Sequence, residues 1–320
     1  MTLDTRLALM LTVPPMLWAG NAVVGRLAVG SIGPLWLNAA RWALALALLW
    51  PLGRRAFGSP AARAQVRRRW PHLAMLGLTG VGAYNALQYM ALTTSTPLNV
   101  TLIAASTPVF AMAVGAAFYG ERPRTGQLHG AWLSLAGVAV VLSRGELSAL
   151  ARVQLVSGDL LMLVAVVSWA FYSWMLARPP AHLRAPERPD WNWAEFLTVQ
   201  IVLGLGWAVA GAGLGELVAP SAPPRWSTGL ALALVYVAVG PALIAYRAWG
   251  LGVARAGPAV AAFFANLTPL FAALLSAAML GEWPQPFHGL AFALIVAGIV
   301  VSSRTAAPPA AAARPGGSAR

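Results

Sequence analysis

The sequence contains two copies of one pattern, 161 positions apart. Residues 97–140 and 258–301 are identical at 15 of 44 aligned positions, without a gap. In each copy two apolar stretches are joined by a short turn, which contains Gly120-Glu121 in the first copy and Gly281-Glu282 in the second. Repetition over this length indicates that both copies build the same structural unit. Many secondary transporters consist of a duplicated block of membrane helices, with the substrate site where the blocks meet.

The chain is too apolar for a soluble domain. It is 59% hydrophobic and 10% charged, whereas soluble domains are about 25% charged, and its mean hydropathy is +0.68. All 22 basic residues are arginine, and the net charge is +13. These arginines lie between apolar runs and form no single basic patch, so we expect no nucleic-acid partner. The absence of cysteine excludes disulfides and thiolate metal sites.

The apolar stretches are long enough to cross a lipid bilayer. A transmembrane helix needs about 20 apolar residues, and ten stretches meet this length. We predict spans at 7–29, 34–53, 71–92, 97–119, 127–143, 157–177, 194–213, 228–252, 258–280 and 286–303. The first stretch follows Arg6 but is too long for the apolar part of a signal peptide, so we expect it to be retained. The predicted fold is therefore an all-α membrane protein with ten transmembrane helices.

The positions of the arginines predict the orientation of these spans. With a cytoplasmic N-terminus, sixteen arginines fall in cytoplasmic segments and only Arg144, Arg152 and Arg225 in outer ones. Cytoplasmic loops are enriched in basic residues, so both termini are predicted to be cytoplasmic. Because each half has five spans, an odd number, the second half must run in the opposite sense. The ten helices thus form two inverted five-helix repeats, the arrangement used for alternating access.

Three segments follow from this division. Residues 1–145 form the first repeat, with helices one to five, and residues 146–304 form the second, with helices six to ten. Residues 305–320 are rich in alanine, proline and glycine. A segment of this low complexity cannot build a packed core, so we expect a disordered cytoplasmic tail.

An ordered set of motifs along the chain matches one known family. The motifs of the first half are Trp18-Ala-Gly-Asn21, Leu37-Asn-Ala-Ala-Arg41-Trp42, Thr107-Pro108-Val-Phe110, Gly120-Glu121, Gly130 and Gly137. Those of the second half are Trp169, Thr268-Pro269-Leu-Phe271, Gly281-Glu282 and Gly298. With these motifs the chain resembles the EamA type of the drug/metabolite transporter superfamily over nearly all of residues 7–303. In the second half Ala291 stands where the family pattern has glycine, a minor departure.

The resemblance implies a class of activity but not a substrate. Members of this family are mostly exporters of amino acids and other small metabolites across the bacterial inner membrane. The resemblance therefore implies a multi-pass inner-membrane permease that works by alternating access. A carrier of nucleosides, sugar conjugates or neutral drug-like solutes is the alternative within this class. A lipid-modifying membrane enzyme and a sensor or scaffold are alternatives from other classes.

Polar and aromatic side chains inside the predicted spans are the candidates for a substrate cavity. A polar group at membrane depth needs a partner or a task. Aromatic walls with a few amides suit a small solute that is neutral or zwitterionic. The predicted cavity residues are Trp18, Asn21, Tyr84, Asn85, Gln88, Trp169, Tyr172, Tyr246 and Asn266. The alternative is that they form hydrogen bonds between helices, as such residues commonly do in lipid.

A second set of residues is predicted to be structural. Arg41 lies deep in the second span, where we expect it to bond carbonyls or a neighbouring helix end rather than the substrate. Pro108 and Pro269 interrupt their helices and are candidate hinges. Glu121 and Glu282 follow a glycine that ends a helix, and we expect them to cap that helix or to pair with a nearby arginine.

The acidic residues and histidines are informative through their positions. All nine acidic residues lie in tails, loops or span ends, so no mid-membrane carboxylate is available to exchange a proton for a substrate cation. No spacing typical of a metal site or of a catalytic nucleophile and base is present. We therefore predict a monomeric permease whose partners are the lipid bilayer and a small-molecule solute. We expect no catalytic activity, metal or cofactor, and transport that needs no proton gradient.

Overall fold

The computed structural model describes residues 5–95, 100, 103–143, 145, 146, 148, 156–280 and 285–304. Within these residues all regular structure is helical, and no strand is present. The first half contains α1 (Thr5–Val29), α2 (Pro34–Gly53), η1 (Arg54–Phe57), α3 (Pro60–Arg68), α4 (Trp70–Leu76), η2 (Gly77–Ala83), α5 (Tyr84–Thr94), α7 (Thr107–Tyr119) and α8 (Thr125–Leu142). The second half contains α9 (Ser157–Ala177), η4 (Ala181–Leu183), α10 (Trp193–Val218), α11 (Thr228–Val237), η5 (Ala238–Ile244), α12 (Ala245–Ala256), α13 (Pro258–Ala265), α14 (Thr268–Leu280) and α15 (Pro286–Arg304).

Helices occupy the described part of every predicted span. Five helical segments are long and apolar enough to cross a membrane by length and composition, namely Thr5–Gly25, Pro34–Phe57, Ser157–Ala177, Trp193–Val218 and Thr228–Ala256. Three further apolar segments are shorter, namely Thr107–Tyr119, Pro258–Ala272 and Gly289–Ser302. The predicted all-α fold is confirmed, and the number of ten membrane crossings stays a prediction.

The repeat extends further through the fold than through the sequence. The π-helices η2 and η5 occupy equivalent positions, because a shift of 161 residues converts the bounds of one into those of the other. The same shift converts α7 into α14. Directly before each of these two helices a pair of turn residues interrupts the helical path, 105–106 in the first half and 266–267 in the second. Each half therefore contains a π-helix and a broken helix at matching positions.

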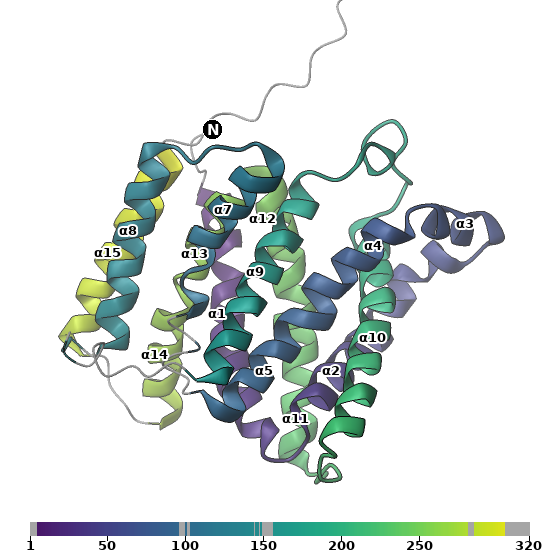
Figure 1. The fold of residues 1–320 in the computed structure, drawn as a ribbon, viewed down its shortest axis with the longest axis horizontal. Helices are drawn as coiled ribbons and strands as arrows, with labels where there is room; N and C mark the ends of the chain where they lie inside the picture. Colours follow the sequence, from purple (N-terminus) through teal and green to yellow (C-terminus); the bar gives the residue numbers. More distant parts are fainter. Residues whose placement is uncertain are drawn as a thin grey trace, which may run out of the picture.

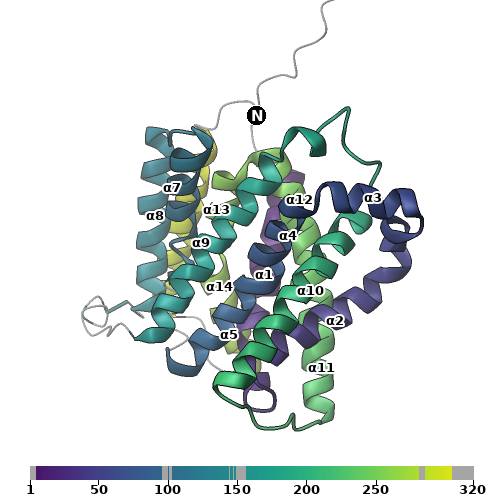
Figure 2. The same ribbon diagram turned by 45° about the vertical axis from the view of Figure 1, so that its right-hand side comes forward.

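The last described helices of the two halves contact each other reciprocally. α8 and α15 lie side by side at one edge of the bundle (Figure 1, Figure 2). A Cβ on Gly130 would lie 2.6 Å from the carbonyl oxygen of Gly298, and one on Gly137 would lie 2.8 Å from that of Ala291. The shift pairs Gly130 with Ala291 and Gly137 with Gly298, so the two contacts exchange. Such exchange indicates a pseudo-twofold relation between antiparallel helices.

The two halves exchange their first helices and share one core. α1 packs against α12 and α14 of the second half, and α9 packs against α5 and α7 of the first half. Accordingly α1 and α9 both run through the middle of the bundle in Figure 1. A single core cluster contains Leu11, Trp42, Leu73, Trp169 and Trp249, which come from both halves. The centre of the molecule is thus the boundary between the repeats.

The connections predicted to be cytoplasmic gather at one end of the bundle. Arg55 pairs with Asp190 at 3.2 Å and with Glu195 at 2.7 Å, which joins the α2–α4 connection to the start of α10. Arg69 donates to the carbonyl oxygen of His182 at 2.7 Å and to that of Glu187 at 2.7 Å. These connections lie at the upper end in Figure 1, opposite the α1–α2 and α10–α11 connections.

Candidate functional site

Seven aromatic side chains meet where the two halves join, and Trp169 lies at their centre. The centroid of the Trp169 ring lies 5.0–5.4 Å from the rings of five others, namely Trp18, Tyr84, Tyr172, Tyr246 and Trp249. Trp42 joins through Tyr246, with centroids 5.0 Å apart. We call these seven residues the aromatic cluster. It brings together five of the predicted cavity residues, carried by α1, α5, α9 and α12.

The π-helix η2 presents its backbone carbonyls to side chains of other helices. A π-helix changes the regular i→i−4 bonding of the α-helix, and buried carbonyls must find other donors. Ser168 Oγ donates to the carbonyl of Thr79 at 2.9 Å, and the Tyr246 hydroxyl donates to that of Gly80. Asn38 Nδ2 lies 3.3 Å from the carbonyl oxygens of both Val81 and Gly82. Helices α2, α9 and α12 therefore hold η2 in place.

The second π-helix is held in an equivalent way. Trp18 Nε1 donates to the carbonyl of Pro241 at 3.4 Å, and Pro241 corresponds to Gly80 under the repeat shift. Each half thus uses an aromatic donor from the other half at the same carbonyl position. Gly80 also allows close packing, because a Cβ there would lie 2.5 Å from the ring of Tyr172. Any larger residue at position 80 would displace a member of the aromatic cluster.

Most polar atoms of the aromatic cluster are already bonded. The Tyr172 hydroxyl donates to Gln200 Oε1 at 3.1 Å, and Trp249 Nε1 donates to Ser173 Oγ at 3.1 Å. Trp169, Tyr172, Tyr246 and Trp249 are each 4% exposed or less, whereas Trp18 and Tyr84 are half-buried. The aromatic cluster therefore offers mainly ring faces and edges, which suit apolar or aromatic groups.

A buried arginine with three polar neighbours lies beside the aromatic cluster. Arg41 is 0% exposed, and its Nη1 lies 3.3 Å from Asn21 Oδ1, 2.8 Å from Asn85 Oδ1 and 2.9 Å from the Tyr89 hydroxyl. The Tyr89 hydroxyl also donates to Asn21 Oδ1 at 3.0 Å. We call these four residues the arginine cluster. No described backbone carbonyl bonds Arg41, and its described partners are side-chain oxygens on the neighbouring helices α1 and α5.

The guanidinium of Arg41 is only partly satisfied. Among the described residues, its Nε and Nη2 atoms have no hydrogen-bond partner, and no carboxylate lies within 4 Å of the group. Each unsatisfied buried donor costs about 1–3 kcal/mol, and an uncompensated buried charge costs several kcal/mol more. The guanidinium is also 5.2 Å from the ring centre of Trp42, a contact that compensates for part of this charge.

The two remaining cavity candidates lie apart from these contacts. Gln88 is half-buried one helical turn after Tyr84 on α5, and it makes no hydrogen bond to the described residues. Asn266 is completely buried in the break between α13 and α14. Neither polar atom of its amide has a partner among the described residues. The structure thus places Gln88 near the aromatic cluster and Asn266 at a helix break.

Apart from Arg41, the described residues that were predicted to be structural lie at helix breaks and ends. Pro108 and Pro269 each occupy the second position of a helix that starts after a break, α7 and α14. Gly120 ends α7 in the left-handed region with φ of 68°, a conformation that glycine adopts without strain. Glu121 forms an ion pair with Arg178 at the end of α9, so its partner is distant in sequence rather than local. Glu282 lies outside the described residues.

Several contributors to this region were not among the nine predicted cavity residues. They include Asn38, Trp42, Ser168 and Gln200. Asn38 and Gln200 are buried amides in apolar helices. Like the predicted cavity residues, they are polar side chains inside predicted spans, so the same criterion could have identified them. Trp42 is fully buried. It was named in the sequence only as part of the motif that contains Arg41. Ser168 carries no sequence signal of its own, because its role depends on a carbonyl freed in another helix.

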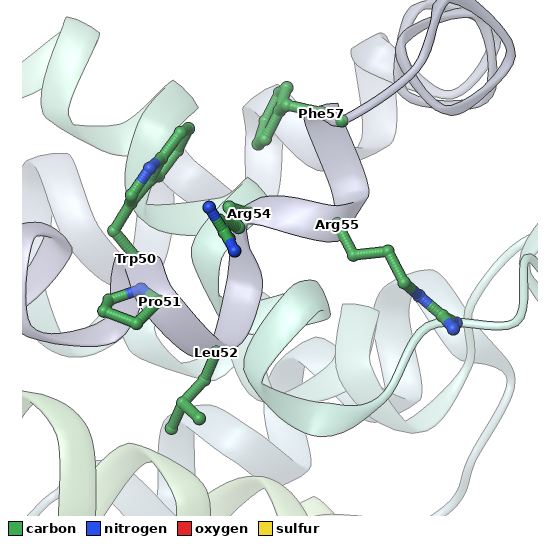
Figure 3. Close-up of a pocket in the computed structure, with 7 residues that line it drawn as sticks. Trp50, Pro51, Leu52, Arg54, Arg55 and Phe57 are labelled. Atoms are coloured by element: carbon green, nitrogen blue, oxygen red, sulfur yellow. The ribbon is translucent and has the colours of Figure 1, made fainter.

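A separate pocket of about 400 Å³ opens at the end of α2 (Figure 3). It is lined by Trp50, Pro51, Leu52, Arg54, Arg55, Phe57 and Gly58. In Figure 3 Arg55 points away from Trp50, toward its acidic partners in the second half. The pocket shares no residue with the aromatic cluster. Its exposed tryptophan and arginines are typical of a membrane–water interface.

The described residues contain no cluster of three or more histidine and acidic side chains that could hold a metal ion. Asp159 and Glu195 are buried, but each lies in the first turn of its helix and caps it. Asp159 accepts from the backbone N–H of Val156 at 2.8 Å, and Glu195 accepts from that of Asn192 at 2.9 Å. Both carboxylates therefore have a structural role at the ends of α9 and α10.

Known proteins resemble the chain over most of its length. The profile of the EamA-like transporter family matches residues 5–143 and again residues 156–304. An uncharacterized transporter of Archaeoglobus fulgidus is 25% identical over 94% of this chain and 98% of its own. A probable terminal-alkyne amino-acid exporter of Streptantibioticus cattleyicolor is 27% identical, covering 93% and 92%. The aromatic amino acid exporter YddG of Ancylobacter novellus is 26% identical, covering 74% and 77%.

A solved crystal structure is also similar. It has a TM-score of 0.71 and 25% sequence identity, covering 95% of this chain and 98% of its own. These findings confirm the resemblance inferred from the sequence motifs and the transporter class that it implied. A chain of this kind lies in a membrane, which agrees with the apolar helices of the fold. The chain belongs to the EamA-like transporter family.

Proposed function

We propose that this transporter moves an amino-acid-like solute outward across the bacterial inner membrane, with the aromatic cluster lining its path. The observation that carries the proposal is the meeting of rings from both halves around Trp169. Two relatives named as exporters of an alkyne amino acid and of aromatic amino acids support this substrate class. Rings that stack on apolar groups suit such solutes.

The proposed membrane arrangement has ten spans in two inverted repeats, residues 1–145 and 146–304, followed by a cytoplasmic tail over 305–320. The antiparallel, reciprocal contact of α8 with α15 supports the inversion. Both termini face the cytoplasm in this arrangement. The arginine-rich connections near Arg55 and Arg69 gather at one end of the bundle, as a cytoplasmic end should.

In the proposed mechanism the two halves rock against each other around the aromatic cluster. The rings at its centre are almost fully buried, so they must separate to admit a solute. The breaks before Pro108 and Pro269 are the proposed hinges, because helical hydrogen bonding is already interrupted there. The Glu121–Arg178 ion pair joins the end of α7 to the end of α9, and it closes one end of the path between the halves.

The side chains have distinct proposed roles. The residues proposed to contact the solute are Trp18, Tyr84, Gln88, Trp169, Tyr172 and Tyr246. Asn266 becomes available to the solute when the helix break opens. Asn21 and Asn85 act through Arg41, to which they are bonded. The transporter works as a monomer, without a metal or cofactor. No described helix carries a carboxylate in the middle of the membrane that could couple transport to protons. In the proposed mechanism the solute gradient therefore drives transport.

The proposal is tested by an efflux assay with purified protein in proteoliposomes. The solute panel contains aromatic, aliphatic and alkyne amino acids, a nucleoside, a neutral sugar conjugate and a neutral drug. We expect protein-dependent efflux of at least one amino acid and slower efflux of the nucleoside, the sugar conjugate and the drug. Efflux confined to the nucleoside, sugar conjugate or drug would contradict the proposed substrate class. A resistance screen of cells that overproduce the protein selects further amino-acid analogues for the panel.

A further inference from the structure

The unpaired atoms of Arg41 lie on one edge of its guanidinium. Its partners Asn21, Asn85 and Tyr89 all contact Nη1. The remaining donors belong to Nε and Nη2, and no described residue accepts a hydrogen bond from them. In an arginine side chain these two nitrogens form a parallel pair of N–H donors. A carboxylate matches such a pair with two parallel hydrogen bonds.

The arginine cluster adjoins the aromatic cluster, which lines the proposed path of the solute. Asn85 follows Tyr84, whose ring lies against Trp169 at 5.1 Å. Trp42 follows Arg41, and its ring lies 5.0 Å from that of Tyr246. The guanidinium of Arg41 lies 5.2 Å from the centre of the Trp42 ring, so the arginine cluster contacts the aromatic cluster through Trp42. A solute with an apolar side chain and a carboxylate would meet both clusters.

We propose that the Nε and Nη2 edge of Arg41 binds the carboxylate of the transported solute. This inference rests on the proposed function and narrows it to solutes that carry a carboxylate, such as amino acids and simple carboxylic acids. Cationic amines, nucleosides and neutral sugars lack the group that would satisfy the buried cation. The solute compensates a charge that no described acidic residue compensates.

Asn21, Asn85 and Tyr89 are positioning residues in this arrangement. They hold Nη1 from two helices, with Asn21 on α1 and Asn85 and Tyr89 on α5, and so fix the direction of the opposite edge. The bond from Tyr89 to Asn21 fixes the amide in turn. Lysine at position 41 would keep the charge but would lack the paired donors, so it should retain only part of the preference for a carboxylate.

The experiment compares a carboxylate with its neutral isostere on the wild-type protein. The probes are 3-phenylpropionate and 3-phenylpropionamide, and the readout is the concentration that gives a half-maximal rise of the unfolding temperature in lipid nanodiscs. We expect the carboxylate to act at a concentration at least tenfold lower than the amide. Equal potency of the two probes would overturn the inference. This comparison uses only the wild-type protein, so it does not depend on the folding of a variant.

Variants then assign the preference to one residue. Arg41→Gln should abolish the tenfold preference, and Arg41→Lys should reduce it. Arg247→Gln is the matched control, since Arg247 lies over the ring of Trp193 at 4.8 Å and outside both clusters. It should retain the full preference. A preference that survives in folded Arg41→Gln would overturn the assignment.

Two further arms separate this inference from its alternatives. Replacing chloride by methanesulfonate should leave the preference unchanged; a rise in stability that follows chloride and not the carboxylate would place an inorganic anion at Arg41 and overturn the inference. Carboxylate preference in a protein that moves no amino acid would support the site and contradict the proposed function. Efflux of amino acids without any carboxylate preference would support the function and overturn the site.

Discussion

At the scale of single residues, Trp169 contacts more rings than any other side chain of the aromatic cluster. Its ring contacts rings from both halves of the protein, so it links the repeats directly. Trp18 stands at the matching motif position in the first half, and the two rings meet at 5.2 Å. In the proposed mechanism, a side chain at this boundary both fills the core and faces the path that opens when the halves separate.

Replacing Trp169 by alanine should lower the rate of amino-acid efflux at least tenfold. The substitution removes the ring on which the others pack, and phenylalanine should restore part of the rate by restoring an aromatic surface. The measurement is efflux per mole of protein in proteoliposomes. Trp132→Ala is the control, because Trp132 is 73% exposed on α8 and lies outside the aromatic cluster. A wild-type rate in Trp169→Ala would place the path elsewhere.

Replacing Tyr246 by phenylalanine should destabilise the protein while keeping the ring. The lost hydroxyl leaves the carbonyl of Gly80 without its donor, and an unsatisfied buried group costs about 1–3 kcal/mol. The midpoint of denaturant unfolding in detergent measures this change. Tyr84→Phe serves as the comparison, since the Tyr84 hydroxyl bonds no described residue and should be replaced with little loss. Equal midpoints for both variants would refute the proposed support of η2.

At the scale of elements, two devices recur in both halves: a π-helix in the third helical path and a break in the fourth. Both interrupt regular hydrogen bonding at membrane depth, where unpaired backbone groups are expensive. In η2 four successive carbonyls are met by side chains from α2, α9 and α12. The interruption therefore ties neighbouring helices together instead of loosening the bundle.

Replacing Gly130 by leucine should separate α8 from α15. Its Cβ would lie 2.6 Å from the carbonyl oxygen of Gly298, so the helices would have to move apart. Overpacking of this kind typically destabilises by about 1–3 kcal/mol. Gly211→Leu on α10 is the matched control, because nothing lies within 4 Å of a Cβ there. Similar unfolding midpoints for the two variants would contradict the close packing of these helices.

Most elements of this fold are predictable from sequence, because long apolar runs and their punctuation by glycine and proline set helix positions. The predicted spans 34–53 and 157–177 have the bounds of α2 and α9. The π-helices were not predicted, since residues 77–83 and 238–244 share little sequence despite their common geometry. Their shape depends on donors from other helices, such as Asn38, Ser168 and Tyr246, which a single segment cannot reveal.

The candidate site was predictable in part for a related reason. Large aromatic residues inside apolar spans must pack on one another or on a solute, and five predicted ones meet at Trp169. The partners of a polar residue depend on how helices are rotated about their axes. Arg41 was expected to bond carbonyls or a neighbouring helix end, and the rotation of α1 and α5 brings the amide oxygens of Asn21 and Asn85 to it. Whether these residues contact solute stays a prediction.

At the scale of the whole molecule, the two halves share a backbone plan but differ in polarity. The buried cation of Arg41 belongs to the first half, and most rings of the aromatic cluster belong to the second. A solute between them would contact one half through its charge and the other through its apolar part. Relative motion of the halves would then change both contacts together.

Transport should continue without a pH gradient. The described acidic residues lie in loops or at helix ends, where Asp159 and Glu195 cap α9 and α10 and cannot serve as mid-membrane proton carriers. Proteoliposomes should exchange labelled amino acid at equal internal and external pH. A protonophore should change the rate by less than twofold for a zwitterionic solute. Accumulation that requires an imposed proton gradient would contradict this coupling and direct attention to these carboxylates.

The central claim is that the halves move relative to each other around the aromatic cluster. The chain has no cysteine, so the pair Glu121→Cys and Arg178→Cys introduces the only two thiols, at the contact between the ends of α7 and α9. Efflux in proteoliposomes is measured after oxidation to a disulfide and again after reduction, with each single variant as control. We predict at least a tenfold loss on oxidation that reduction reverses. Unchanged efflux in fully cross-linked protein would contradict the claim.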